Sequence, residues 1–132
     1  MIRGRIVAAW LLAATSALAV ACSPRYDSVE LRRVAGHPAA RVSDREITVP
    51  EGGLVVIEAD ALSAAGSRDY EAIDAMELFS GNSDRVRVVQ GLRVDTWMVL
   101  GVSQGDTEVL VRLNDRVEDG IPVRVTPQEV TP

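Results

Sequence analysis

The chain has one cysteine, one histidine and no lysine, and these shortages exclude several kinds of site. One cysteine cannot form a disulfide within the chain, and with one histidine it cannot supply the four ligands of structural zinc. His37 lies between Gly36 and Pro38 in a predicted loop, without the nucleophile and orienting carboxylate that a general base requires, so we interpret it as a solvent-exposed loop histidine. The sequence also lacks a glycine-rich phosphate loop and a Gly-x-Ser-x-Gly turn. It therefore predicts no enzyme, no catalytic residue, no cofactor and no metal site.

Aromatic residues are scarce and the charge is acidic. After the first 21 residues the aromatic side chains are Tyr26, Tyr70, Phe79 and Trp97. These are too few for the stacking surfaces that bind single-stranded nucleic acid. The 14 basic residues, all arginine, stand against 19 acidic ones, a net charge of −5. An acidic chain is a poor partner for nucleic acid or for an anionic membrane surface.

Calcium is the metal for which the chain offers oxygen ligands, because acidic residues gather in predicted loops. The groups are Asn114, Asp115, Glu118 and Asp119, and, near other turns, Asp69, Glu71, Asp74 and Asp84. Their spacing does not match the alternating ligands and closing glutamate of an EF-hand loop. A polar hairpin that ends in Asp-Gly explains the C-terminal group without a metal, and we prefer that interpretation.

The N-terminal residues have the pattern of a secretory signal at 1–21. Arg3 and Arg5 precede an uncharged stretch, 6–24, in which Ala19 and Ala21 supply the small residues of a cleavage site. Cleavage leaves roughly 110 residues, with 12 basic against 19 acidic residues and a net charge of about −7. The alternative is an uncleaved membrane anchor, since the stretch approaches the length that spans a bilayer. Its many alanines, and the absence of a basic cluster after it, favour the cleaved signal.

The single cysteine, Cys22, directly follows this cleavage site in the sequence Ala-Val-Ala-Cys. An unpaired thiol is unusual in an oxidising compartment. The segment resembles the lipobox of bacterial lipoproteins, although Ala19 stands where leucine is commonest and Leu18 lies one residue earlier. The resemblance implies a diacylglyceryl group on Cys22, whose acyl chains, such as palmitate, anchor the protein in a membrane. It also implies the outer membrane, because Ser23 stands where an inner-membrane retention signal would have aspartate. Ordinary signal peptidase would cut the same bond, after Ala21, and leave no lipid.

The rest of the chain consists of short apolar runs separated by Gly, Pro, Asn and Asp, as in all-β proteins. We predict a lipidated tether at 22–27 and one domain at 28–132. Val109, Val111 and Leu113 alternate with less apolar residues, which predicts antiparallel strands half covered by a second layer. The predicted strands are Ser28–Val34, Arg45–Val49, Leu54–Leu62, Ala75–Phe79, Arg85–Gln90, Val94–Val102, Thr107–Asn114 and Ile121–Thr126.

Two segments leave local alternatives. Residues 68–79 also carry a ragged helical pattern, and we predict a strand for their C-terminal half, Ala75–Phe79, because its neighbours are rich in strands. Pro122 has no N–H to give to a neighbouring strand, so we expect its strand to be an edge strand or to begin there.

The second half of the domain carries a recurring order of residues. Ser83-Asp84, Val86, Val88, Gly101-Val102, Gly105 and an alternating strand from Thr107 to Val111 follow one another. This order resembles the bacterial Ig-like domain, group 2, over about 80–125, with a looser fit upstream. Trp97 departs from it, because that strand position is more often aliphatic. We expect a positive φ at the turn residue Gly105, and we expect Asp84 to cap its own turn, near Ser80.

This resemblance implies an all-β, Ig-like antiparallel β-sandwich of about seven to eight strands. With the N-terminal signal it leads us to expect a membrane-tethered, non-enzymatic binding or structural module of the bacterial cell envelope. The expected partners are membrane lipid, through Cys22, and another envelope protein or a surface ligand. The alternative is a small accessory subunit of an envelope enzyme or secretion complex.

Overall fold

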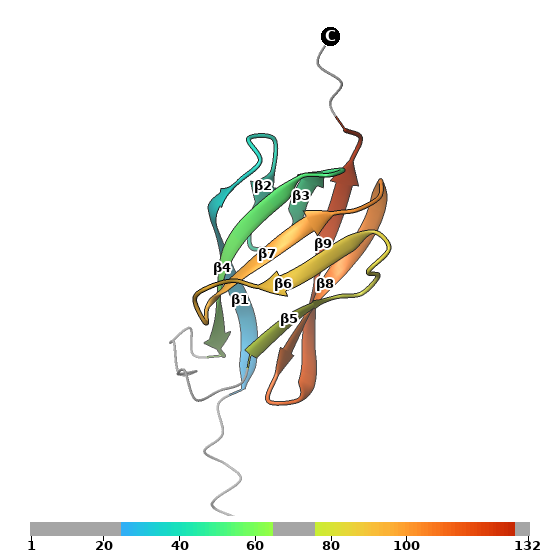
Figure 1. The fold of residues 1–132 in the computed structure, drawn as a ribbon. Coiled ribbons are helices and arrows are strands. Elements are labelled where there is room, and N and C mark those ends of the chain that lie inside the picture. The colour runs from blue at the N-terminus through green and yellow to red at the C-terminus, as the bar shows by residue number, and fades with distance from the viewer. Residues whose placement is uncertain (1–24, 65–75, 129–132) are drawn as a thin grey trace, which may run out of the picture.

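The computed structural model describes residues 25–64 and 76–128, and in this part of the chain it shows nine β-strands and no helix (Figure 1). Apolar side chains recur at alternate positions, the period at which an extended chain presents one face to a core. The strands are β1 (Tyr26–Gly36), β2 (Arg41–Val42), β3 (Ile47–Pro50), β4 (Leu54–Ser63), β5 (Met76–Ser80), β6 (Val86–Gln90), β7 (Thr96–Gly101), β8 (Gly105–Leu113) and β9 (Arg116–Thr126).

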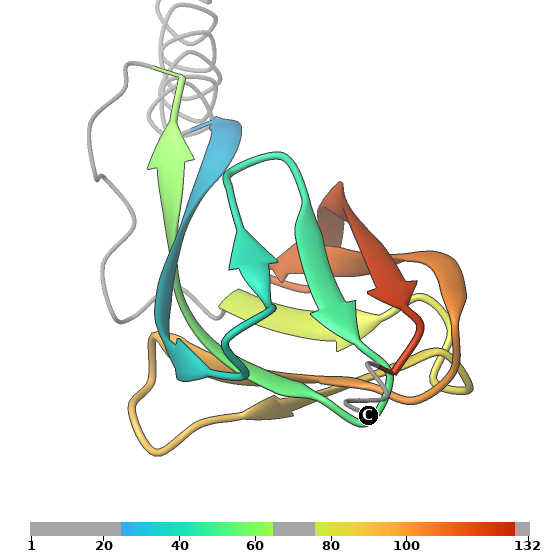
Figure 2. The same ribbon diagram turned by 90° about the horizontal axis from the view of Figure 1, so that it is seen from above.

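The strands form two sheets that pack face to face, as the view from above shows (Figure 2). One sheet has four strands in the order β1-β4-β7-β6, and the other has five in the order β2-β3-β9-β8-β5. Every neighbouring pair is antiparallel except β3 and β9, which run parallel with Ile47 opposite Val123. The predicted all-β, Ig-like sandwich is confirmed, with one parallel pair that residue alternation could not predict.

Aliphatic side chains from the inner faces of both sheets make up the core. Val109, Val111 and Leu113 of β8 are at most 5% exposed, while the residues between them reach solvent, so the predicted alternation is confirmed. Trp97 of β7 also lies in this core, at 3% exposure. Each buried Val, Leu or Ile contributes about 1.5–3 kcal/mol. With no disulfide possible, this burial is the main stabilisation of the fold.

Most predicted strands are present, with shifted ends. β1 begins at Tyr26, two residues inside the segment predicted as a tether, and β2 was not predicted. In the ambiguous stretch the described part, from Met76, is a strand, as predicted, whereas residues 68–75 lie outside the described residues. The neighbouring strands therefore decided the structure of a segment whose own pattern was weak.

The turn between β8 and β9 is shorter than predicted. Only Asn114 and Asp115 connect the two strands, with φ of 49° and 66°. Two central residues with positive φ make a type I′ turn, whose twist matches that of paired strands. The prediction of a longer polar turn ending at Gly120 was wrong, because β9 already begins at Arg116.

The prediction for Pro122 was also wrong. Its strand, β9, begins six residues earlier and lies inside the five-stranded sheet, between β3 and β8. Pairing with β3 starts only at Val123, whereas Pro122 is paired with Glu108 of β8. Pro122 is tolerated because, at its position, β9 has a partner strand on one side only.

The turns that lead into β6 and β8 agree with the sequence in part. Gly105 has a φ of 138°, as predicted, and a Cβ there would collide with the guanidinium of Arg85. In the turn between β5 and β6, the predicted cap from Asp84 is replaced by Asn82, whose Oδ1 accepts a hydrogen bond from the Asp84 N–H at 3.0 Å. An asparagine side chain makes this local turn as readily as an aspartate does.

Candidate interaction surface

The outer face of the four-stranded sheet carries side chains that the core does not use. Two rows cross β4, β7 and β6: Leu54, Leu100 and Arg87 form the first, and Val56, Met98 and Val89 the second. Val89 is 56% exposed and Leu54 38%, while the other apolar members are half-buried. We call Leu54, Val56, Val89, Met98 and Leu100 the outer patch. Contiguous exposed apolar groups of this kind mark interaction sites.

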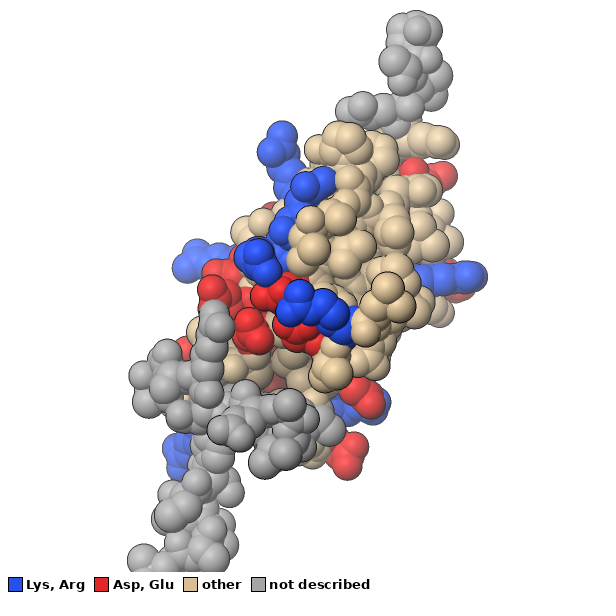
Figure 3. All heavy atoms as spheres, turned by 60° about the vertical axis from the view of Figure 1, so that its left-hand side comes forward, with Lys and Arg blue, Asp and Glu red and all other residues tan. Residues whose placement is uncertain are grey.

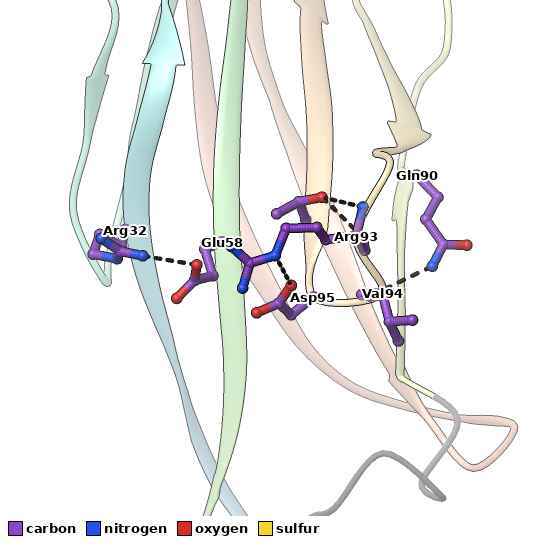
Figure 4. A network of polar contacts seen from close by, with 7 residues as sticks. Arg32, Glu58, Gln90, Arg93, Val94 and Asp95 are labelled. Carbon is purple, nitrogen blue, oxygen red and sulfur yellow. Dashed lines mark hydrogen bonds and ion pairs between the residues drawn. The ribbon is translucent and has the colours of Figure 1, made fainter.

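Charged side chains border the outer patch on the side toward the start of β1. Arg32 of β1 donates from Nη2 to Oε2 of Glu58 on β4 at 2.7 Å, and Arg93 Nε lies 3.5 Å from Asp95 Oδ1 (Figure 4). Acidic and basic groups gather on this side of the molecule, beside a broad uncharged surface (Figure 3). Exposed ion pairs of this kind stabilise a fold little, so their arrangement matters more for recognition than for folding.

The loop between β6 and β7 carries two more exposed apolar side chains. Thr96 fixes its shape: Oγ1 donates to the Arg93 carbonyl at 2.9 Å and accepts from the Arg93 N–H at 3.2 Å. The Gly91 N–H donates to the Thr96 carbonyl at 2.8 Å. Between these contacts Leu92 is fully exposed and Val94 is 72% exposed. Two apolar side chains are thus held in solvent by a hydrogen-bonded loop.

A contact between the sheets closes the end of the sandwich at which β1 begins. Tyr26 Oη donates to Asp119 Oδ2 of β9 at 2.8 Å. Burial of the ring and this hydrogen bond to a carboxylate raise the pKa of Tyr26 well above its usual value, so the hydroxyl stays protonated. The residues are 93 positions apart, and nothing in the sequence paired them. The contact is structural and clamps the first strand of the domain.

His37, the one histidine, takes part in the structure of its own loop. Its Nδ1 accepts a hydrogen bond from the Ala39 N–H at 3.1 Å, and its backbone N–H donates to the Leu54 carbonyl at 2.7 Å. The ring is half-buried rather than fully exposed as expected. In the described chain no carboxylate or hydroxyl side chain bonds to it, so the structure does not place it in a catalytic pair.

The acidic residues considered as calcium ligands and the predicted lipid site differ in what the structure says of them. Within residues 25–64 and 76–128, no three histidine, cysteine or acidic side chains lie close enough together to hold a metal ion. Asp119 is instead bonded to Tyr26. Asp69, Glu71, Asp74 and Cys22 lie outside the described residues, so lipid attachment stays a prediction. The stretch 6–24 lies outside them too, and no helix in the described part is long and apolar enough to cross a membrane.

Comparison with solved structures finds the fold in bacterial surface layer domains. Against surface layer protein SbsC, domains 1–6, the TM-score is 0.56 at 14% identity, over 82% of this chain and 14% of that one. Against SbsC domains 4 and 5 it is 0.52 at 15% identity, over 79% of this chain and 54% of that one. Against domains 4–9 it is 0.55 at 14% identity, over 81% and 15%. The likeness is one of fold.

These comparisons bear on the resemblances proposed from the sequence. No protein family matches the sequence, and no curated protein matches it significantly. Assignment to the bacterial Ig-like group 2 and to lipoproteins therefore stays a prediction, while the sandwich itself is confirmed. The chain spans 14% and 15% of the two longer surface layer structures and 54% of the shorter one.

Proposed function

We propose that this chain is a membrane-tethered, non-enzymatic Ig-like module of the bacterial cell envelope. The observation that carries the proposal is the likeness of its sandwich to domains of a surface layer protein. The N-terminal signal pattern supports the same compartment. The core is filled by aliphatic side chains, and the outer patch offers contacts rather than chemistry. Structure and docking are therefore the activities that this fold supports.

The tether that we propose is a lipid on Cys22, and its position restricts how the domain is held. Cys22 lies four residues before Tyr26, where β1 begins. An extended chain spans at most about 3.6 Å per residue, so this link reaches roughly 14 Å. The start of β1 and the β8–β9 turn lie at one end of the sandwich, and the end of β9 lies at the other (Figure 1). Lipidation would keep the first end close to the membrane and present the second outward.

The test compares wild type with Cys22→Ser in bacterial cells. We expect a wild-type N-terminal peptide that begins at Cys22 and carries the mass of the lipid, and a protein that partitions into detergent. Cys22→Ser should lose the lipid and partition into buffer with an unchanged circular dichroism spectrum, because acyl chains supply the anchoring. An unmodified, soluble wild type would refute the lipid. Both proteins bound to membrane with intact N-termini would instead identify 6–24 as an anchor.

The accessory-subunit role is the second candidate, and the outer patch favours it. Apolar side chains on a sheet face, bordered by ion pairs, suit docking on another envelope protein. Crosslinking in intact cells distinguishes the two roles. A stable complex with an envelope enzyme or secretion component would favour the accessory subunit. Binding of purified protein to whole cells or to matrix would favour a surface module.

A further inference from the structure

We propose that the outer patch is a self-association surface, on which a second copy of this chain docks face to face around a two-fold axis at Met98. The inference concerns residues of the folded domain and does not depend on a lipid at Cys22. It begins from the distribution of exposed apolar side chains. Leu54, Val89, Leu92 and Val94 all belong to the four-stranded sheet or its β6–β7 loop. Val117 is a large exposed apolar side chain of the other sheet, on β9.

The charges on this face select a second copy as its occupant. Arg87, at the end of the first row, has no ion-pair partner among residues 25–64 and 76–128. Glu58 is paired with Arg32 through one oxygen only, Oε2, and its side chain is 16% exposed. The face thus presents a cation without an anion, and a carboxylate with capacity for a second cation. A face that carries both complementary groups can satisfy itself through a symmetric contact.

The strand register places these two groups symmetrically about Met98. Arg87 of β6 is opposite Leu100, two residues beyond Met98 on β7. Glu58 of β4 is opposite Thr96, two residues before Met98. With strands about 4.8 Å apart and residues about 3.3 Å apart, each group lies about 8 Å from Met98, in opposite directions. A two-fold axis that lies in the plane of the interface, over Met98 and at right angles to the line from Arg87 to Glu58, therefore brings Arg87 of each copy to Glu58 of the other, with apolar side chains between the two contacts.

The size of the face sets the strength of the contact. Its four strands and the seven residues 54–60 cover roughly 19 by 23 Å, on the order of 440 Å² in projection. A stable interface buries about 800 Å² of accessible surface on each partner. The face offers about half of that area, so the dimer should be weak in dilute solution. It should form readily when copies are concentrated on one membrane.

Thiol crosslinking tests the position of the axis. In Cys22→Ser protein an introduced cysteine is the only thiol. Facing sheets lie about 10 Å apart, too far for a direct disulfide but within reach of a short bismaleimide. Met98→Cys should give crosslinked dimer, and Val117→Cys, at a residue 57% exposed on the other sheet, should give little. Equal crosslinking at the two positions, or none at Met98→Cys, would overturn the proposal.

A charge exchange tests the pairing, again in Cys22→Ser protein. Sedimentation equilibrium should show that Arg87→Glu and Glu58→Arg each weaken the dimer by about tenfold or more, because each places like charges together twice. The double variant should restore it. Val89→Ser should weaken association while Val117→Ser, at matched exposure, leaves it unchanged. Three results would each refute a second copy as the occupant. The first is a monomer at every concentration, and the second is a double variant that dimerises no more tightly than the single variants. The third is a monomer that binds phosphatidylglycerol vesicles through this patch.

Discussion

Replacing Val111 by aspartate tests the inward register of β8 directly. Val111 is 0% exposed and lies opposite Leu78 of β5 and Asp119 of β9. The change removes a buried aliphatic side chain, worth about 1.5–3 kcal/mol. It also forces a carboxyl group without a partner into the core, at about 2–7 kcal/mol. The sum of roughly 4–10 kcal/mol approaches the whole stability of a domain, about 5–15 kcal/mol, so we expect a largely unfolded protein.

Arg112→Asp is the matched control, one residue along the same strand and on the opposite face. The Arg112 guanidinium pairs with Glu77 and lies 5.1 Å from the centre of the Phe79 ring. Both contacts are on the surface, where water screens charges. Their loss should therefore lower the free energy of unfolding far less than burial of a carboxyl group at Val111.

Urea unfolding followed by Trp97 fluorescence measures both effects, because this ring is 3% exposed and reports on the core. Wild type and Arg112→Asp should unfold cooperatively at similar midpoints. Val111→Asp should show no cooperative transition. Equal losses in the two variants, or a well-folded Val111→Asp, would mean that β8 is displaced by one residue, since such a shift exchanges its two faces.

Two further changes test local contacts. Tyr26→Phe removes the hydrogen bond to Asp119 and should lower the free energy of unfolding by about 1–2 kcal/mol in thermal denaturation. The pKa of Tyr26 is raised in the folded state, so the difference in unfolding free energy between wild type and Tyr26→Phe should be complete below the unfolded pKa of about 10 and shrink as pH rises above it. A difference independent of pH would contradict the hydrogen bond between Tyr26 and Asp119. Asp115→Gly should stabilise by about 0.5–1 kcal/mol in urea, because φ is 66° there, and Asp115→Val should destabilise. Loss of stability in the glycine variant would argue against the type I′ turn.

The sequence predicted those features that depend on neighbouring residues. Alternation of apolar residues identified β8 and the inward positions of β9, because the period of two is a property of the strand itself. Gly105 identified a position with positive φ for a similar reason. The predictions failed for β2, for Pro122 and for the cap at Asp84. In each case the outcome depended on which strand or side chain lay beside the residue, and not on the residue itself.

By itself, then, the sequence determined the class of the fold, the facing of its strongest strands and a signal-like N-terminus ending at Cys22. Only the tertiary structure decided that β3 runs parallel to β9, that Tyr26 meets Asp119, and that Arg87 and Glu58 lie on opposite sides of Met98. The physical reason is that periodicity records whether a side chain points inward or outward. Contacts between residues tens of positions apart depend on sheet order and register, which are fixed only when the two layers close on a common core.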